Sequence, residues 1–304
     1  MDGLRLTVIV PTWNACEVLD ACLGSLAAQE LPGGFETIVV DNASTDDTAA
    51  VLRRHADRVR VIANDSNVGF SVANNQAASV ARGRILFFLN SDAELLAPDT
   101  LARLADAVEE RGVAIVGPML VNVDGSLQPS CAAHPGVGRA LAIAAGLPRV
   151  LPDRLRARVA PHLWSHDRPM ETDWVKGAAM AVRTDAFREL GGFWPTLYGE
   201  EQDLAYRAQE RGLAVRFEPS ARVLHVGNHS LGQRASDAQR AERVANAELT
   251  FLRAHYSRPR AAAIRAITGT AYALRALAHG VLRNRSQAGV YRSLARTYAA
   301  GAKR

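Results

Sequence analysis

The sequence predicts an α/β fold in which a mostly parallel sheet is flanked by helices and followed by a C-terminal helical extension. Short apolar runs rich in Val and Ile alternate with segments whose apolar residues recur at spacings of three and four. This alternation is typical of parallel strands joined by helical crossovers. Polar residues follow several of the apolar runs directly, as expected at the carboxyl edge of such a sheet. The last part of the chain contains only helical patterns rich in Ala and Arg.

The first half of the chain alternates regularly between the two kinds of segment. Strands are expected at residues 4–10, 35–40, 59–62, 85–89 and 113–116. Helices are expected at residues 18–26, near 51–52, at 71–81 and at 99–111. The five apolar residues 85–89 indicate a buried central strand. Ser44 and Asp47 have the spacing of a capping box for the short helix.

The pattern in the second half is less regular. Residues 119–123 and 127–130 are expected to form a hairpin. Residues 132–168, rich in Ala, Gly, Pro and Arg, are interpreted as a variable insertion with one or two short helices. Further strands are expected at 172–175, 178–182, 214–217 and 221–226, and further helices at 184–190, 200–211, 236–255 and in two segments beyond 257. We expect one domain at 1–232, which includes the insertion, and a basic helical extension at 233–304.

Composition excludes several classes of protein. The chain has 304 residues, of which 48% are hydrophobic and 22% charged, values typical of a globular protein. Three widely spaced cysteines, Cys16, Cys22 and Cys131, indicate neither a disulfide framework nor a structural zinc site. No signal peptide precedes the first strand, and no apolar run approaches the roughly 20 residues needed to span a bilayer. We therefore expect a cytoplasmic protein.

The net charge of +5 is distributed unevenly along the chain. Residues 249–304 contain 11 of the 36 Lys and Arg residues and no Asp or Glu, so residues 1–248 carry 25 basic and 31 acidic residues. Basic amphipathic helices suit an anionic membrane surface, and we expect the tail to lie on the inner face of the cell membrane. The alternative is a solvated helical appendage that packs on the body or on a second subunit. Charge alone also permits nucleic acid, but no binding motif accompanies it, so none is expected.

The residues after the central strand point to a metal site. Asn90, Ser91 and Asp92 follow residues 85–89 directly. Ligands of open α/β sheets sit at the carboxyl ends of strands, and a carboxylate beside an amide suits a hard divalent cation that bridges to substrate phosphates. The alternative is that Ser91 and Asp92 cap the next helix.

Two other strand ends carry polar groups. Pro11, Thr12 and Asn14 follow the first strand, and Asp41 and Ser44 follow the second. Asp41 is placed to accept a hydrogen bond from a base N–H or a ribose hydroxyl. The alternative for Asp41 is a local Asx-turn.

A polar helix start and a cluster of carboxylates complete the candidate set. Asn67, Gly69 and Asn74 surround a helix N-terminus whose N–H groups could meet a nucleotide or sugar, although a turn and cap would use the same residues. Three carboxylates, those of Glu200, Glu201 and Asp203, open another helix.

Each of these carboxylates has an alternative to catalysis. The helix dipole suffices to explain Glu200, and Arg207 four residues on suffices for Asp203. Glu201 shares its face with apolar residues, which tends to raise a carboxyl pKa and suits a general base. His225 ends a strand, where it is either structural or a metal ligand, and His229 follows it.

At this point the sequence resembles the family 2 glycosyltransferases of the GT-A (Rossmann-like) fold, and in particular their bacterial rhamnosyltransferase-like members. The resemblance covers about residues 5–232. It rests on seven motifs in order: Val8–Asn14, Val39–Asp46, Asn67–Phe70, Phe88–Asp92, Gly191–Phe193, Gly199–Leu204 and Val223–Gly227. Each motif is weak by itself, and their order and spacing make the combination specific.

The resemblance implies an inverting transfer from a nucleotide-diphosphate sugar, with dTDP or UDP as the nucleotide, to a hydroxyl of a glycan or polyprenyl-linked acceptor in cell-envelope polysaccharide synthesis. It implies that the nucleotide is held by residues of the first two strand ends: Pro11, Thr12, Asn14, Asp41 and Ser44. It also implies that Asp92, within the counterpart of the family's Asp-x-Asp, binds Mg²⁺ or Mn²⁺ with help from His225. Glu201 falls where the family usually has the Asp that deprotonates the acceptor.

The chain departs from the family pattern at two of these positions. Asn90 replaces the first Asp of Asp-x-Asp, as it does in many members of this branch. Glu201 replaces an Asp, and its extra methylene moves the carboxylate by more than an ångström, a displacement that can reduce a rate about 10²-fold. Glu200 and Asp203 therefore remain alternatives for the base.

Two other functions compete with transfer. A nucleotidyltransferase would require a Gly-rich loop bearing Lys or Arg after the first strand, and the sequence has none there. A non-catalytic module that binds sugar nucleotides or glycans remains open because of the Glu201 departure. The sequence gives no indication of an oligomeric state.

Overall fold

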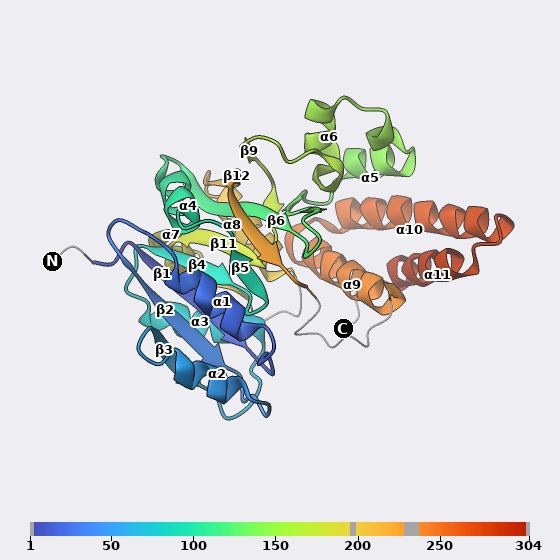
Figure 1. Cartoon of the computed structure of the whole chain (residues 1–304). Coiled ribbons are helices and arrows are strands. Elements are labelled where there is room, and N and C mark those ends of the chain that lie inside the picture. Colours follow the sequence, from blue (N-terminus) through green and yellow to red (C-terminus); the bar gives the residue numbers. More distant parts are fainter. Residues whose placement is uncertain (1–2, 195–198, 228–236, 302–304) are drawn as a thin grey trace. The chain divides into compact units, whose positions relative to one another are not determined.

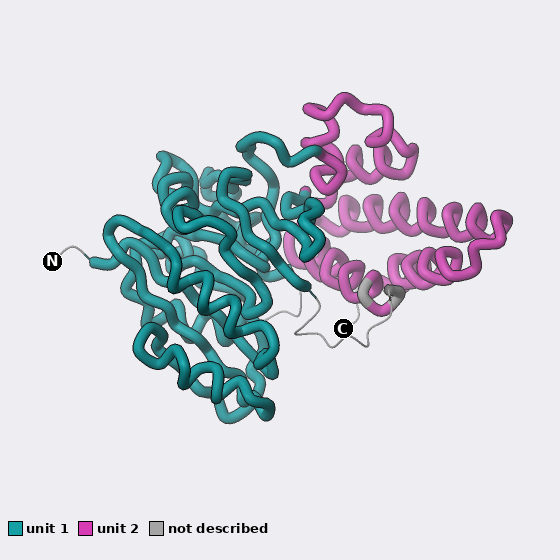
Figure 2. The backbone as a smooth tube through the Cα atoms, viewed as in Figure 1, with its two compact units in different colours: residues 1–132, 165–232 teal, residues 133–164, 233–304 magenta. Residues whose placement is uncertain are grey.

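The computed structural model describes residues 3–194, 199–227 and 237–301, and the chain forms two compact units. The first unit consists of residues 1–132 and 165–232, and the second of residues 133–164 and 233–304 (Figure 2). The boundary expected near residue 232 lies outside the described residues. Residues 133–164, most of the insertion expected at 132–168 within the first domain, group with the C-terminal helices.

The first unit is built on one mixed sheet (Figure 1). Its strands are β1 (Leu6–Thr12), β2 (Phe35–Asp41), β3 (Val59–Ala63), β4 (Ile85–Leu89), β5 (Ala93–Leu95), β6 (Val113–Val121), β7 (Leu127–Gln128), β9 (Met170–Glu171), β11 (Ala179–Arg183) and β12 (Ala214–His225). The order is β3-β2-β1-β4-β11-β6-β12-β5, with β7 paired to β6 and β9 paired to β12. Strands β3, β2, β1 and β4 are mutually parallel, as are β6 and β12. The expected mostly parallel sheet is confirmed.

Strands β11, β5, β7 and β9 run against the parallel direction. Strand β11 is antiparallel to both β4 and β6, β5 is antiparallel to β12, and β7 is antiparallel to β6. The expected hairpin is therefore confirmed as β6–β7. A separate small pair joins β8 (Cys131–Ala132) to β10 (Trp174–Val175).

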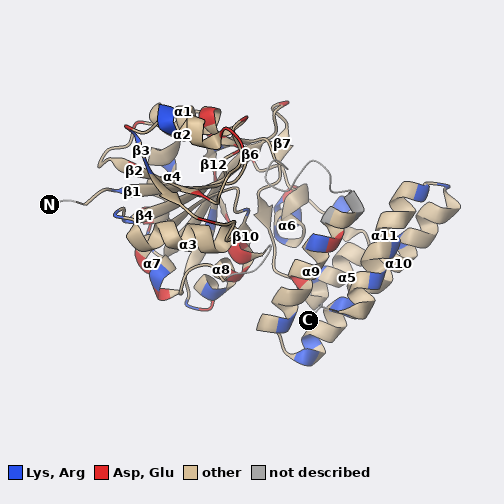
Figure 3. Ribbon diagram, turned by 90° about the horizontal axis from the view of Figure 1, so that it is seen from below, with Lys and Arg blue, Asp and Glu red and all other residues tan. Residues whose placement is uncertain are grey.

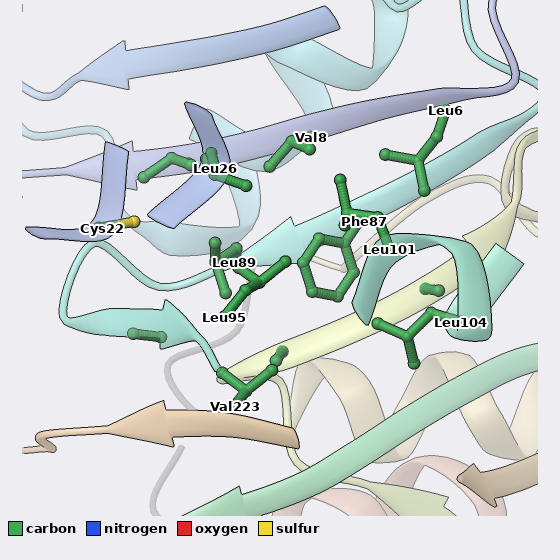
Figure 4. Close-up of a cluster of buried hydrophobic side chains, with 14 of the residues drawn as sticks. Leu6, Val8, Cys22, Leu26, Phe87, Leu89, Leu95, Leu101, Leu104 and Val223 are labelled. Atoms are coloured by element: carbon green, nitrogen blue, oxygen red, sulfur yellow. The ribbon is translucent and has the colours of Figure 1, made fainter. Parts of the chain in front are cut away.

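Helices cover both faces of the sheet. They are α1 (Leu19–Ala27), α2 (Thr48–Arg54), α3 (Phe70–Val80), α4 (Thr100–Glu109), α7 (Thr184–Glu189) and α8 (Glu200–Gln209). Alternate side chains of β4 enter opposite cores: Phe87 and Leu89 pack with α1 and α4, whereas Phe88 packs with α3, α7 and α8. Figure 4 shows the first of these cores. Burial on both faces explains why 85–89 reads as a continuous apolar run.

Several expected boundaries are wrong. Residues 113–116 and 119–121 belong to one strand, β6, and the two strands expected at 214–226 are a single strand, β12, with an irregularity between Glu218 and Arg222. The three-residue strand β5 was not expected at all. The segment between α3 and β4 packs closely against β1, because a Cβ on Gly83 would lie 2.4 Å from backbone atoms of Leu6 and Thr7. Glycine is needed there for the close approach of two backbones.

The second unit is helical. It contains α5 (Val137–Ala144), η1 (Leu147–Arg149), α6 (Asp153–Val159), η2 (Pro161–Leu163), α9 (Asp237–His255), α10 (Arg258–Val281) and α11 (Arg285–Ala300). Leu249, Ile264 and Tyr298 are among the residues of its core. The Tyr256 hydroxyl donates to the Pro135 carbonyl at 2.7 Å, which ties residues 133–164 to the C-terminal helices. No helix of the described residues is long and apolar enough to cross a membrane.

Candidate active site

The carboxyl ends of β1 and β2 lie side by side, since Thr12 pairs with Asp41. Asn14 connects the two ends. Its φ of 50° lies in the left-handed region, which Asn adopts more often than most other residues except glycine. Its backbone N–H donates to Ser44 Oγ at 2.9 Å, and its Oδ1 accepts from the Thr45 N–H at 2.7 Å. The structure thus brings together the side chains expected to hold a nucleotide.

The Asp41 carboxylate is partly used within this loop. Its Oδ1 accepts from the Ser44 hydroxyl at 2.6 Å and from the Ser44 N–H at 3.1 Å. Both bonds belong to a local turn, so the Asx-turn alternative is correct for Asp41 Oδ1. Thr12 Oγ1 is buried and has no hydrogen-bond partner within the described part of the chain, which suits a site completed by a polar ligand.

The expected capping box before α2 is wrong, because Ser44 bonds to Asp41. Asp46 holds the helix start instead: Oδ1 accepts from the Thr48 N–H at 3.0 Å and Oδ2 from the Cys16 N–H at 3.1 Å. Burial raises the pKa of Asp46, but these hydrogen bonds outweigh it and lower the pKa to about 2. Asp46 is therefore an ionised anchor between the first two crossovers.

The polar start of α3 is organised locally. Asn67 Oδ1 accepts from the Gly69 N–H at 2.9 Å, and Gly69 occupies the N-cap with a φ of 83°. Asn74 is fully buried and donates to the Phe70 carbonyl at 2.9 Å. Its Oδ1 is buried with no hydrogen-bond partner in the described residues. The turn-and-cap alternative accounts for Asn67 and Gly69, and the ligand role of Asn74 stays a prediction.

Asp92 and His225 meet beyond the end of β4. Strands β5 and β12 pair so that His225 lies opposite Ala93, and the Val226 N–H donates to the Asp92 carbonyl at 3.0 Å. Asp92 Oδ1 lies 3.4 Å from His225 Nε2. The Asn90 amide nitrogen lies 3.3 Å from the same ring nitrogen. The alternative that Asp92 caps the next helix is wrong, because β5 intervenes and α4 begins only at Thr100.

Gln128, which the sequence analysis did not single out, holds the other side of the imidazole. Its Oε1 lies 2.7 Å from His225 Nδ1. It reaches this position because β7 folds back on β6, and β6 is itself paired with β12. Ser91, between Asn90 and Asp92, is 3% exposed.

Glu201 approaches this group from α8. An ideal Cβ on Gly177 would lie 3.6 Å from the Glu201 carboxyl carbon, and the next residue, Ala178, accepts a hydrogen bond from the Asn90 N–H at 2.9 Å. Burial raises the pKa of Glu201, while backbone N–H groups and the charge of Lys176 oppose that rise. Burial also lowers the pKa of Lys176. A carboxylate of raised pKa beside an ammonium group suits general base catalysis.

The other two carboxylates of α8 are placed differently. Glu200 is buried at the first position of the helix. Asp203 Oδ2 accepts from Arg207 Nε at 2.8 Å, and Arg207 also donates to the Gly192 carbonyl at 2.8 Å. This pair ties α8 to the turn before it, as the ion-pair alternative for Asp203 described. His229 lies outside the described residues.

The sequence of the chain matches a family model over residues 7–174, more than half of its length; the model describes glycosyl transferase family 2. The chain belongs to this family. The matched range contains three of the four strand ends described above and Gln128, and it leaves Glu201 and His225 beyond its end.

The names of two similar proteins are consistent with this assignment. The chain is 29% identical to an N-acetylglucosaminyl-diphospho-decaprenol L-rhamnosyltransferase of Mycobacterium tuberculosis, over 75% of the chain and 78% of that protein. It is 29% identical to the O-antigen biosynthesis protein RfbC of Myxococcus xanthus, over 77% of the chain but 18% of that protein. An uncharacterised Sinorhizobium fredii protein is 28% identical over 79% of the chain and 26% of its own length. The chain thus spans about a quarter or less of these last two relatives.

Solved structures confirm the GT-A fold. A mannosyltransferase of Pyrobaculum calidifontis, in complex with GDP-Man and Mn²⁺, superposes with a TM-score of 0.64 at 19% identity and covers 98% of this chain and 88% of its own.

Two side chains of this glycosyltransferase fit a divalent cation. In the part of the chain that the structure describes, no group of three or more His, Cys, Asp and Glu side chains is arranged to hold a metal ion. The Asp92 carboxylate and the His225 imidazole face each other, and together they offer two donors. Mg²⁺ and Mn²⁺ commonly take one or two protein ligands and complete their shell with phosphate oxygens and water. The residues fit a cation of that kind.

Proposed function

We propose that this protein is an inverting glycosyltransferase that moves a sugar from a dTDP- or UDP-sugar to a hydroxyl of a glycan or lipid-linked acceptor in cell-envelope polysaccharide synthesis. One observation carries the proposal. Glu201 contacts Gly177 while the adjoining Ala178 bonds to Asn90, so a candidate base and the Asn90–Asp92 turn share one edge of the sheet. The M. tuberculosis relative, named for a diphospho-decaprenol substrate, supports a lipid-linked acceptor.

In this proposal the ends of β1 and β2 bind the nucleotide. Asp41 is partly exposed and its carboxylate accepts a hydrogen bond from the base or the ribose, in addition to the bonds from Ser44. Thr12 Oγ1 bonds to the same ligand, which satisfies its buried oxygen. Pro11, Asn14 and Ser44 shape the loop around it.

Asp92 and His225 would hold a Mg²⁺ or Mn²⁺ ion. When bound, such an ion would neutralise the charge that develops on the departing nucleotide diphosphate. Asn90 lies beside the imidazole and keeps its amide directed at Nε2. The burial of Asp92, which is 3% exposed, strengthens its attraction for a cation.

Glu201 is the proposed base. The acceptor oxygen attacks the anomeric carbon from the face opposite the diphosphate, so the new C–O bond forms as the bond to the diphosphate oxygen breaks. Glu201 takes the proton that the acceptor hydroxyl loses. The ion pair of Asp203 with Arg207 leaves Glu201 as a better candidate than Asp203.

A non-catalytic module that binds sugar nucleotides is the second candidate. The Glu at position 201, where the family usually has Asp, favours it. Hydrolysis of the donor that requires a divalent cation separates the two candidates, because a binding module leaves the donor intact.

The C-terminal helices are proposed to bind an anionic membrane surface. Leu274, Leu277 and Val281 recur at spacings of three and four on α10 and are 61%, 68% and 84% exposed. Helices α10 and α11 carry Arg275 and further cations and no acidic residue (Figure 3). Exposed apolar groups beside cations suit the interface of an anionic bilayer.

The donor class is tested by thermal denaturation in the presence of UDP-, dTDP- and GDP-sugars, each with and without Mn²⁺. A ligand that binds only the native state raises the melting temperature by mass action. We expect a rise with one nucleotide class that depends on Mn²⁺. No rise with any of them would contradict the assignment of donor and cation.

A further inference from the structure

Gln128 has an amide orientation that its neighbours determine. Its Nε2 donates to Asn122 Oδ1 at 2.9 Å and to the His225 carbonyl at 3.3 Å. A carbonyl oxygen only accepts, so the amide nitrogen must face this side. The oxygen of the same amide therefore faces His225 Nδ1, at 2.7 Å.

The orientation of Asn122 is determined in the same way. Its Nδ2 donates to Ser126 Oγ at 2.9 Å and points toward the Leu127 carbonyl, so its Oδ1 is the atom that accepts from Gln128. The Ser126 hydroxyl proton is engaged elsewhere, because Ser126 Oγ lies 2.6 Å from Asp124 Oδ1. A carboxylate accepts and does not donate, and the hydrogen bond from Ser126 lowers the pKa of Asp124.

These contacts form one directed chain of hydrogen bonds along the β6–β7 hairpin. It runs from His225 to Gln128, Asn122, Ser126 and finally Asp124, and each group donates to the next. Since Gln128 Oε1 can only accept, His225 must carry its proton on Nδ1. Its Nε2 then has a lone pair, directed toward Asp92 Oδ1 at 3.4 Å and the Asn90 amide at 3.3 Å.

We propose that Gln128 is a positioning residue that holds His225 in the Nδ1–H tautomer and so presents Nε2, beside Asp92, as a ligand for a divalent cation. This inference rests on the proposed function, which places the cation between these two residues. An outer hydrogen-bond partner that fixes the tautomer of a metal-binding His commonly changes metal affinity by about 10–100-fold. Without the Gln128 oxygen, the Nε2–H tautomer becomes available, and its proton would point at the Asp92 carboxylate and occupy the ligand lone pair.

The tautomer is tested first, in the metal-free protein. Long-range ¹H–¹⁵N correlation spectra distinguish Nδ1–H from Nε2–H in His225, whose signals are assigned with His225→Gln. We expect Nδ1–H in the wild type and in Gln128→Glu, whose carboxylate still accepts. Gln128→Leu is expected to shift the population toward Nε2–H. Val123→Ala, in the exposed part of the same hairpin, is the control and should behave as wild type.

Binding of Mn²⁺ alone, followed by the loss of its free EPR signal, is the second readout. We expect Gln128→Leu to bind about 10–100-fold more weakly than the wild type and Gln128→Glu to recover most of that loss. Asp124→Asn, which leaves a favourable Asn-Gly turn, tests the chain if Gln128→Leu does not fold, and it should weaken binding by a smaller factor.

Two results separate this inference from the proposed function. Gln128→Leu with an unchanged tautomer or an unchanged Mn²⁺ affinity would overturn the role of Gln128. Wild-type protein that binds no Mn²⁺ would refute the cation site itself, and the spectra would still decide whether Gln128 sets the tautomer.

Discussion

Asp92 and His225 face each other across the antiparallel pairing of β5 and β12, with Oδ1 of the carboxylate 3.4 Å from Nε2 of the imidazole. The two residues are far apart in the sequence, and the short strand β5 is what brings them together. Asp92 is 3% exposed, so contact with solvent does not account for a charged side chain at this position.

The first prediction concerns this pair. Asp92→Asn keeps the shape of the side chain and removes its charge, so we expect the Mn²⁺-dependent rise in melting temperature with the sugar nucleotide to disappear. The control is Asp99→Asn, which removes an exposed carboxylate paired with Arg103 outside the site. The same Mn²⁺-dependent rise in Asp92→Asn and the wild type would exclude Asp92 as a cation ligand.

The second prediction concerns Lys176. Its charge lowers the pKa of Glu201, in opposition to burial, so Lys176→Met should raise that pKa further. The acid limb of the pH profile of kcat/KM reports the free enzyme's base, and we expect it to move to higher pH in Lys176→Met. Lys176→Arg retains the charge and should leave the limb near its wild-type position. If the acid limb lies at the same pH in all three proteins, the charge of Lys176 does not affect the pKa of the base.

Much of the candidate site could be predicted from the sequence because it lies at the ends of parallel strands. The carboxyl ends of β1, β2 and β4 share an edge of the sheet, so Thr12, Asp41 and Asn90 converge once the strands are recognised. Their apolar runs are long enough to recognise without tertiary information.

Lys176 could not be predicted by this reasoning. It precedes the strand β11, and a residue before a parallel strand would lie at the opposite edge. Strand β11 runs antiparallel, with Ala179 opposite Leu89, so its amino end lies at the carboxyl edge of β4. Strand direction depends on pairing partners, which periodicity does not reveal.

The role of Gln128 was missed for a related reason. The hairpin was expected, but its position beside His225 depends on the parallel pairing of β6 with β12 across about a hundred intervening residues.

The start of α2 is different. Ser44 and Asp47 had the correct spacing for a cap, and a tertiary hydrogen bond from Asn14 engaged Ser44 instead.

The third prediction is a pH dependence of stability. Asp46 has its pKa lowered from 3.8 to about 2 in the folded protein, so its contribution is present above the unfolded pKa and is lost as the pH falls through the folded one. Asp46 is largely exposed, so screening reduces this contribution to about 1 kcal/mol. Asp46→Asn should lower the free energy of unfolding at pH 7 by that amount and by much less near pH 2. Chemical denaturation at the two pH values measures this difference, and equal losses at both would contradict the ionic role.

The fourth prediction concerns the membrane. Leu274→Glu with Leu277→Glu places two carboxylates on the exposed face of α10, and we expect sedimentation with vesicles of anionic lipid to fall at least several-fold. The matched control is Val123→Glu, an equally exposed apolar residue in the first unit. Unchanged sedimentation of the double variant would leave the helical extension without a membrane role.

The most direct test of the central claim compares wild-type protein with Glu201→Gln. Burial raises the pKa of Glu201 above 4.5, so the folded state loses stability as the pH rises from the unfolded pKa through the folded one, and a neutral Gln avoids this loss. We therefore measure transfer and melting temperature at neutral pH on the same samples, together with binding of the donor. The account predicts a rate reduced by about 10²–10⁴-fold, an unchanged affinity for the donor and a higher melting temperature in Glu201→Gln. Transfer at the wild-type rate would contradict it.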